Sequence, residues 1–254
     1  MTIVGRAAVA VVIVLCCVLA IASPGPNGAL HPQYHASPMS NWMNDPNGPV
    51  FYKGYYHLFF QYNPFAAIWG NMSWGHVVST DLVRWKELPI ALYNDQWYDV
   101  GGVFSGSITL LQDGTPVIAY TCVDAGGIER QCTAYPSDPS DSLLLNWTKS
   151  SHNPVIADPP PNCDGRNTRD DTTAWMVNGM WMMALGTKYS NASGTFGAVI
   201  LYQSPDFVTW TSAVPQVLYS TTMDSMIECP DLFPLASESD PNLFGLKLSM
   251  QGKD

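Results

Sequence analysis

Short runs of alternating, β-branched or aromatic residues recur along the chain, and clusters of Gly, Pro, Asn and Asp separate them. Runs of this length with turn residues at both ends are typical of β-strands. Beyond the first 22 residues no stretch has a helical period. The pattern predicts an all-β fold with strands at residues 48–52, 55–62, 74–79, 105–111, 116–122, 173–177, 181–187 and 198–203.

One short motif repeats. Residues 81–85 read DLVRW, residues 206–210 read DFVTW, and a weaker copy, SLLLNW, lies at 142–147. The tryptophans that end these segments, Trp85, Trp147 and Trp210, are 62 and 63 residues apart. This period accommodates one four-stranded unit with its loops. Repeated units of this size predict the blades of a β-propeller.

Four polar groups follow nearly the same period. Asp45, Ser105, Asp170 and Glu228 are separated by 60, 65 and 58 residues. The innermost strand of each propeller blade lines the central channel, so equivalent positions of successive blades converge. We therefore expect these four side chains to meet in one axial pocket.

The segment around Asp45 is rich in residues that restrict the backbone. Residues 42–48 read WMNDPNG, which sets the carboxylate between two asparagines, a proline and a glycine, with Trp42 upstream. Such residues favour a turn, and amide side chains can hold hydroxyls or the carboxylate. The segment fits either a rigidly framed acid for a polyhydroxylated substrate or a structural Asx-turn between two strands.

Three convergent acids suit the cleavage of a glycosidic bond, which needs one ionised and one protonated carboxyl group. Burial and mutual repulsion separate the pKa values of two such carboxyl groups, so that one is ionised while the other keeps its proton. Asp45, framed by amides, is the better ionised partner, and Glu228, beside apolar Ile227, is the better acid. Asp170 follows Arg169 and suits hydroxyl binding. A calcium site would need several oxygens in one loop, so we expect no metal and no cofactor.

Composition and charge narrow the class of protein. The chain has 254 residues, of which 46% are hydrophobic and 13% charged, and these values predict a folded domain. The net charge is −10 and no basic patch is visible, which argues against nucleic acid as a partner. An acidic net charge is compatible with a neutral substrate but does not identify that substrate.

The N-terminus predicts a targeting segment. Arg6 precedes an uncharged run that ends in the small-residue pattern Ala20-Ile21-Ala22. This is typical of a secretory signal peptide, and an uncleaved signal anchor is the alternative. We expect a signal peptide at 1–22, a lead-in at 23–40, a partial catalytic propeller at 41–254, and no membrane association after cleavage.

Four cysteines remain after the signal peptide, and their spacing fits no zinc motif. A Cys122–Cys132 disulfide and free buried thiols both remain open. Three sequons predict N-glycosylation if the source is eukaryotic, at Asn71, Asn146 and Asn191.

Several short motifs of the chain together resemble those of one enzyme family. Residues 31–254 are similar to glycoside hydrolase family 32, the β-fructofuranosidases of the plant acid invertase and fructan exohydrolase type. The resemblance rests on WMNDPNG at 42–48 and on six further ordered motifs: QYNP at 61–64, WGN at 69–71, SWGH at 73–76, FSGS at 104–107, RD at 169–170 and ECPD at 228–231.

This resemblance implies a five-bladed propeller followed by a β-sandwich. It implies that Asp45 is the nucleophile toward C2 of a fructosyl unit, Glu228 the acid/base, and Asp170 a transition-state stabiliser. The configuration would be retained, with the carboxyl groups of Asp45 and Glu228 about 5–5.5 Å apart. The resemblance further implies substrate-binding roles for Trp42, Asn44, Gln61, Trp69, Ser105 and Arg169.

Three positions depart from the family pattern. Asp171 stands where the family usually has proline, Ile227 where most invertases have tryptophan, and Phe104 where many relatives have tryptophan. A proline would pre-set φ and remove an N–H donor. The loss of that proline and a second acid beside Asp170 predict an altered setting for the stabiliser, and Ile227 favours a fructan substrate.

The length is the larger departure. At about 62 residues per blade, the mature chain holds about 3.7 blades and no sandwich. An open propeller exposes edge strands, so we expect these residues alone to be poorly stable and weakly active or inactive.

Alternatives within this interpretation are a fructosyltransferase and an inactive truncated relative that binds sugar without turnover. A structural secreted β-protein would leave the ordered motifs unexplained. The predicted destination is extracellular or the cell wall, with the vacuole as the alternative. The predicted substrate is sucrose or a β-fructan.

Overall fold

The computed structural model of the chain describes residues 34–235 and 243–252. The predicted signal peptide and the first part of the predicted lead-in lie outside the described residues. Every regular element in the described part is a β-strand, as predicted. Within those residues, the structure contains no helix with the length and apolar character needed to cross a membrane.

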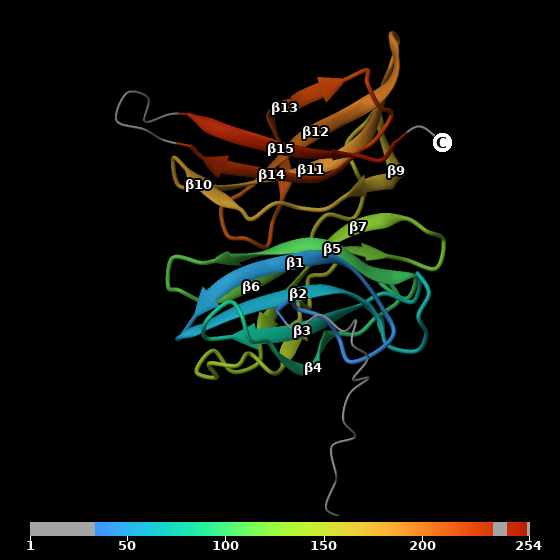
Figure 1. Ribbon diagram of the computed structural model, residues 1–254. Helices are drawn as coiled ribbons and strands as arrows, with labels where there is room; N and C mark the ends of the chain where they lie inside the picture. Colours follow the sequence, from blue (N-terminus) through green and yellow to red (C-terminus); the bar gives the residue numbers. More distant parts are fainter. Residues whose placement is uncertain (1–33, 236–242, 253–254) are drawn as a thin grey trace, which may run out of the picture. The chain divides into compact units, whose positions relative to one another are not determined.

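The first two sheets each contain four antiparallel strands that follow the chain in order (Figure 1). The first sheet consists of β1 (Trp42–Tyr52), β2 (Tyr55–Asn63), β3 (Ser73–Ser79) and β4 (Lys86–Leu92). The second consists of β5 (Gly102–Leu110), β6 (Pro116–Val123), β7 (Glu129–Pro136) and β8 (Trp147–Lys149).

The third sheet has an interrupted first strand. Both β9 (Cys163–Arg169) and β10 (Trp175–Val177) pair with β11 (Met180–Asn191), and β12 (Gly194–Ser204) and β13 (Thr211–Thr221) complete the sheet. The fourth sheet has two strands, β14 (Ile227–Pro234) and β15 (Phe244–Met250), in the described residues. The described part therefore holds three complete units and the first two strands of a fourth.

The repeated motif forms the same turn in three sheets. It connects β3 to β4, β7 to β8 and β12 to β13, which are the third and fourth strands of each sheet. Asp81 Oδ1 accepts the N–H groups of the residues two and three positions later at 2.9 and 2.7 Å, and Asp206 Oδ1 does the same at 2.9 and 2.7 Å. In the middle sheet Asp141 accepts the N–H of Leu143. The repeat predicted from the tryptophans is therefore structural.

The segment 42–48 is part of strand β1 and not a separate turn, which corrects the sequence-based expectation. Its turn-forming residues act differently: the register with β2 shifts between Met43 and Pro46 and again between Asn47 and Val50. Proline removes one ladder donor and the extra residues bulge out of the strand. The irregular strand turns Asp45 away from the regular pleat.

Hydrophobic side chains fill the spaces between successive sheets. Phe59, Trp74 and Tyr120 belong to the core between the first and second sheets, and Val117, Ile200 and Phe207 to the core between the second and third. The first strands also lie close together, with β1 against β5 and β5 against β9 (Figure 1). This packing brings the inner strands to one place, as a propeller requires.

A disulfide joins Cys122 of β6 to Cys132 of β7. The sequence left open whether these two cysteines form a disulfide or carry free thiols, and in this structure they form the disulfide. Cys163 and Cys229 carry free thiols.

Candidate active site

A pocket of about 490 Å³ lies where the inner strands converge, and residues of all four sheets line it. The lining contains eight of the nine sequence-predicted catalytic and substrate-binding residues. Asn167, Phe104 and Gln251 complete it, so that the lining residues are Asn44, Asp45, Gln61, Trp69, Phe104, Ser105, Asn167, Arg169, Asp170, Glu228 and Gln251.

Trp42 is the predicted residue that does not form a wall of this pocket. Its indole N–H donates to Asn44 Oδ1 at 2.8 Å. Because Asn44 lines the pocket, Trp42 fixes a neighbour of Asp45. The substrate-binding role of Trp42 stays a prediction, since its ring does not line the pocket formed by the described residues.

Asp45 projects from the irregular part of β1 and is half-buried. Ser105, on β5, donates its hydroxyl hydrogen to Asp45 Oδ2 at 2.7 Å. The thiol sulfur of Cys229, on β14, lies 4.0 Å from the same oxygen. One hydroxyl donor thus holds a carboxylate that still faces the pocket.

Asp170 follows β9 with a left-handed backbone (φ 64°) and is 6% exposed. Its N–H donates to Thr121 Oγ1 at 3.0 Å, and its Oδ2 accepts the Cys229 N–H at 3.0 Å. Burial raises the pKa of Asp170 to about 6, because desolvation outweighs the opposing charge of Arg169. The second sheet therefore holds the backbone of Asp170 through Thr121, and the fourth sheet holds its carboxyl group through Cys229.

Glu228 is on β14, and Arg169 holds it. Arg169 Nε and Nη2 donate to the same Glu228 oxygen, Oε1, at 3.2 and 2.6 Å. The strand approaches the third sheet closely because residue 186 is glycine: a Cβ there would lie 2.1 Å from the Ile227 carbonyl oxygen. Ile227 is buried and packs with Ala184 and Val199. The isoleucine, which stands where most invertases have tryptophan, is therefore closely packed in this structure.

Two aromatic rings form an exposed wall. Trp69 is 59% exposed and meets Phe104 edge to face, with ring centroids 5.9 Å apart. Gln61 also lines the pocket, and its side-chain amide donates to the Val103 carbonyl at 3.0 Å. Aromatic faces beside polar groups are a suitable surface for the C–H face and hydroxyls of a sugar.

Glu129 was not singled out from the sequence. It is buried on β7, and its carboxylate binds Arg169 Nη1 at 2.8 Å. Burial raises the pKa of Glu129 to about 7 against the opposing effect of Arg169. The only signal in the sequence is a charged residue in a segment that is otherwise largely uncharged, ERQCTAYP, and that signal does not identify the partner of Glu129.

Asp171, which stands in place of the family's usual proline, is buried. Ser107 donates its hydroxyl to Asp171 Oδ2 at 3.1 Å, whereas Oδ1 has no hydrogen-bond partner among the described residues. Desolvation raises the pKa of Asp171 well above its ordinary value. Asp171 does not line the axial pocket, and together with Ser107 it lines a neighbouring cavity of about 260 Å³.

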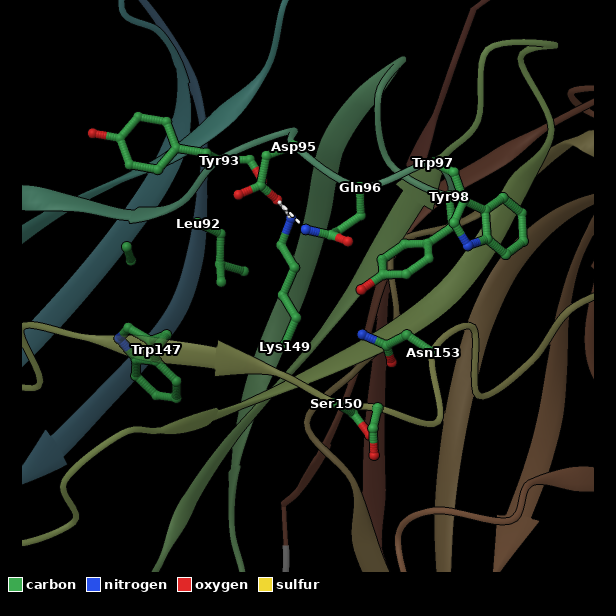
Figure 2. Close-up of a pocket in the computed structure, with 12 residues that line it drawn as sticks. Leu92, Tyr93, Asp95, Gln96, Trp97, Tyr98, Trp147, Lys149, Ser150 and Asn153 are labelled. Atoms are coloured by element: carbon green, nitrogen blue, oxygen red, sulfur yellow. Dashed lines mark hydrogen bonds and ion pairs between the residues drawn. The ribbon is translucent and has the colours of Figure 1, made fainter.

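A second cavity of about 510 Å³ lies between the loop after β4 and strand β8 (Figure 2). Lys149 stands at its centre, and its ammonium group binds Asp95 at 2.7 Å (Figure 2). The same ammonium group binds Asp99 at 2.6 Å. These two acids compensate the lysine charge, and none of the predicted site residues lines this cavity.

The axial pocket therefore combines three carboxyl groups, one guanidinium and an aromatic wall. Within residues 34–235 and 243–252, no group of three or more His, Cys, Asp and Glu side chains is arranged to hold a metal ion. Such a pocket suits a neutral polyhydroxylated ligand that is held by hydrogen bonds and cleaved by carboxyl groups.

Comparison with known proteins gives a consistent result. Residues 35–254 match the family model described as the glycosyl hydrolases family 32 N-terminal domain. The vacuolar acid beta-fructofuranosidase 1 of a Rosa hybrid cultivar is 49% identical over 204 residues, which are 80% of this chain and 34% of the relative. The acid beta-fructofuranosidase of Solanum lycopersicum is 44% identical over 212 residues, 83% of this chain and 32% of the relative. The chain thus spans about a third of the length of these relatives.

Solved structures agree. Fructan 1-exohydrolase IIa of Cichorium intybus is 40% identical with a TM-score of 0.79, over 87% of this chain and 42% of that protein. A Bombyx mori family 32 beta-fructofuranosidase, solved in complex with sucrose, is 36% identical with a TM-score of 0.67, over 81% of this chain and 42% of that protein.

Proposed function

The chain belongs to glycosyl hydrolase family 32, and we propose that its axial pocket binds a terminal β-fructofuranosyl unit of sucrose or a fructan and hydrolyses its glycosidic bond. The observation that carries the proposal is that Asp45, Asp170 and Glu228, from three different sheets, line one pocket together with Arg169. Two carboxyl groups with separate roles are the chemical requirement of this reaction.

In the first step the Asp45 carboxylate attacks C2 of the fructosyl unit, and the bond from C2 to the glycosidic oxygen breaks. Glu228 gives its proton to that oxygen, which leaves as a hydroxyl group of the departing sugar. The Ser105 hydroxyl orients the attacking carboxylate. Asp170 accepts hydrogen bonds from fructose hydroxyls and stabilises the positive charge that develops on the ring.

In the second step Glu228, now a carboxylate, takes a proton from water. The water oxygen forms a bond to C2, the ester bond to Asp45 breaks, and fructose leaves with retained configuration. Arg169 binds Glu228 through Oε1, so that Oε2 is the oxygen that exchanges the proton.

The chemistry of the pocket also supports a substrate class. It has no unpaired cation for a phosphorylated sugar in the part that the structure describes, because Arg169 is already shared by two carboxyl groups. Relatives crystallised with 1-kestose and with sucrose bind neutral fructosides. We propose the same class here, with entry into the secretory pathway, delivery to the vacuole or the outside, and glycans on Asn71, Asn146 and Asn191, all three of which are exposed.

Product analysis tests this proposal. The purified protein is incubated separately with sucrose, 1-kestose, inulin and levan, and the sugars released are separated. Release of free fructose that is abolished by Asp45→Ala supports the hydrolase. Longer oligosaccharides would instead indicate a fructosyltransferase, and saturable sugar binding without any turnover would indicate an inactive sugar-binding relative.

A further inference from the structure

Glu129, the first residue of β7, carries a buried carboxyl group that the reaction described above does not use. It is 5% exposed and lies outside the pocket lining. Burial of a carboxyl group costs free energy unless hydrogen-bond donors surround it. The donors that bind Glu129 therefore determine what this residue does.

Both oxygens of Glu129 face the strand that carries the site. Oε2 accepts the Thr168 N–H at 2.7 Å, and Oε1 accepts a hydrogen from Arg169 Nη1 at 2.8 Å. Thr168 and Arg169 are consecutive residues of β9. One carboxyl group therefore fixes the guanidinium of Arg169 relative to the backbone of its own strand.

The opposite edge of the same guanidinium binds Glu228 Oε1 through Nε and Nη2. A guanidinium is planar and rigid, so fixing one edge fixes the direction of the other. We propose that Glu129 is a positioning residue that acts through Arg169 and sets the place of the Glu228 carboxyl. This inference rests on the acid/base role of Glu228 proposed above.

A competing arrangement is close at hand. Asp170 Oδ2 lies 3.9 Å from Arg169 Nε, beyond a hydrogen bond but within an ion pair. A guanidinium released by Glu129 can turn toward Asp170 and lose Glu228. Glu129 therefore selects one of the two carboxyl groups that the arginine can bind.

The segment that carries Glu129 is itself restrained. The Cys122–Cys132 disulfide ties β6 to β7, and Gln131, two residues after Glu129, donates to the Thr168 carbonyl at 3.1 Å. Glu129 and Gln131 thus bind the N–H and the C=O of the same residue, Thr168. The position of Thr168 against β7 is therefore fixed directly beside the ion pair of Arg169 and Glu129.

Nitrogen-15 NMR of the arginine side chains tests the proposal without substrate. The sequence has five arginines, Arg6, Arg84, Arg130, Arg166 and Arg169, and Arg169→Lys assigns the signal of interest. At about pH 8, above the pKa of about 7 to which burial raises Glu129, the Glu129 carboxyl is ionised. We expect separate Nη signals for Arg169, because bonds at both edges slow its rotation. They merge in Glu129→Ala and shift but stay separate in Glu129→Gln, which keeps one acceptor oxygen.

Two controls separate positioning from folding. Arg130, the next residue on β7, pairs with Asp124 at 3.1 Å, and its signal should stay unchanged in both variants. Glu87→Gln, at a glutamate of the first sheet that accepts the backbone N–H of Met39 at 3.1 Å, should leave the Arg169 signals unchanged. Unaltered Arg169 signals in Glu129→Ala, or equal shifts of Arg130 and Arg169, would overturn the proposal.

Kinetics adds a second measurement. With sucrose as the probe, kcat of Glu129→Ala should fall by about 10- to 100-fold with KM changed little, because the acid is misplaced and the fructose site is not. Glu129→Gln should recover part of the loss. A rise in KM at constant kcat would contradict the positioning role. If the unsubstituted protein hydrolyses neither sucrose, 1-kestose, inulin nor levan, the proposed function fails, while the NMR result still decides the position of Arg169.

Discussion

Asp45 and Asp170 lie in the same pocket but in opposite settings. Asp45 is half-buried on an irregular edge of β1 and receives one side-chain hydroxyl bond, from Ser105. Asp170 is buried, has a left-handed backbone and is bound on both sides through Thr121 and Cys229. The first setting leaves a carboxylate accessible for attack, and the second holds a carboxyl still for binding. Position on equivalent inner strands thus brings the two acids together, while the difference in burial suits them to the two roles proposed for them.

Replacing each carboxylate in turn should have the largest effect and should show whether Asp45 and Asp170 act differently. Asp45→Asn should lower kcat/KM for sucrose by about 10⁴-fold or more, because no nucleophile remains. Fructose affinity should change little in this variant. Asp170→Asn should weaken fructose binding as well, because its oxygens hold hydroxyls.

The measurements are initial rates and fructose titration calorimetry on both variants. Equal losses of affinity in the two variants would show that the settings do not separate the roles. Thermal unfolding of each variant checks that the fold persists.

The burial of Asp170 should also make the free energy of unfolding depend on pH. Its pKa is raised to about 6 in the folded protein, against about 3.9 in an unfolded chain. The folded state then binds more protons between these values, so stability falls as pH rises from about 4 to about 6. The expected loss is about 3 kcal/mol. Urea unfolding across this range measures it.

Asp170→Asn provides the comparison for that titration. The variant has no carboxyl at this position, so its stability should fall less over the same interval. Glu129, whose burial raises its pKa to about 7, adds a decrease of the same sign that extends to neutral pH. A stability that rises from pH about 4 to about 6 would contradict the burial argument.

The single hydroxyl bond of Asp45 predicts a smaller effect. Ser105→Ala removes a 2.7 Å hydrogen bond to a charged group, which is worth about 1.5–3 kcal/mol. We expect kcat/KM to fall by about 10-fold or somewhat more. Ser107→Ala is the matched control, because Ser107 binds Asp171 and not Asp45, and its effect on the rate should be smaller.

The aromatic wall should matter least. Phe104→Trp enlarges a ring that contacts Trp69 at the exposed side of the pocket. Because both acids stay in place, kcat should change less than about threefold, with any effect in KM. A large fall in kcat would show that Phe104 supports the carboxyl groups rather than the wall.

The sequence predicted the all-β class and the repeat because both rest on local periodicity. It missed β9, whose residues CDGRNTR lack an apolar alternation. That strand is stabilised by bonds from another sheet, Glu129 and Gln131 to Thr168, and such bonds leave no pattern in the strand itself. The expected strands likewise leave out β4, β7, β8, β13, β14 and β15. Of these, β13 and β15 are largely exposed, so that they lack a continuous run of buried apolar residues.

The site divides in the same way. Asp45, Ser105, Asp170 and Glu228 could be predicted to converge because they recur on equivalent inner strands. Glu129 could not, because it lies on the third strand of its sheet and its partner depends on how β7 packs against β9. The sequence also left open whether Asp45 lies in a structural Asx-turn, since bulged strands and turns use the same residues.

Direct trapping of the covalent intermediate tests the role of Asp45. In Glu228→Gln the second step lacks its base, so a fructosyl donor with a good leaving group, such as fructosyl fluoride, should load the enzyme faster than water clears it. Peptide mass spectrometry should then find one fructosyl unit on the peptide that contains Asp45. A fructosyl unit on Asp170, or turnover of the donor with no adduct at Asp45 when the reaction is quenched, would contradict the account.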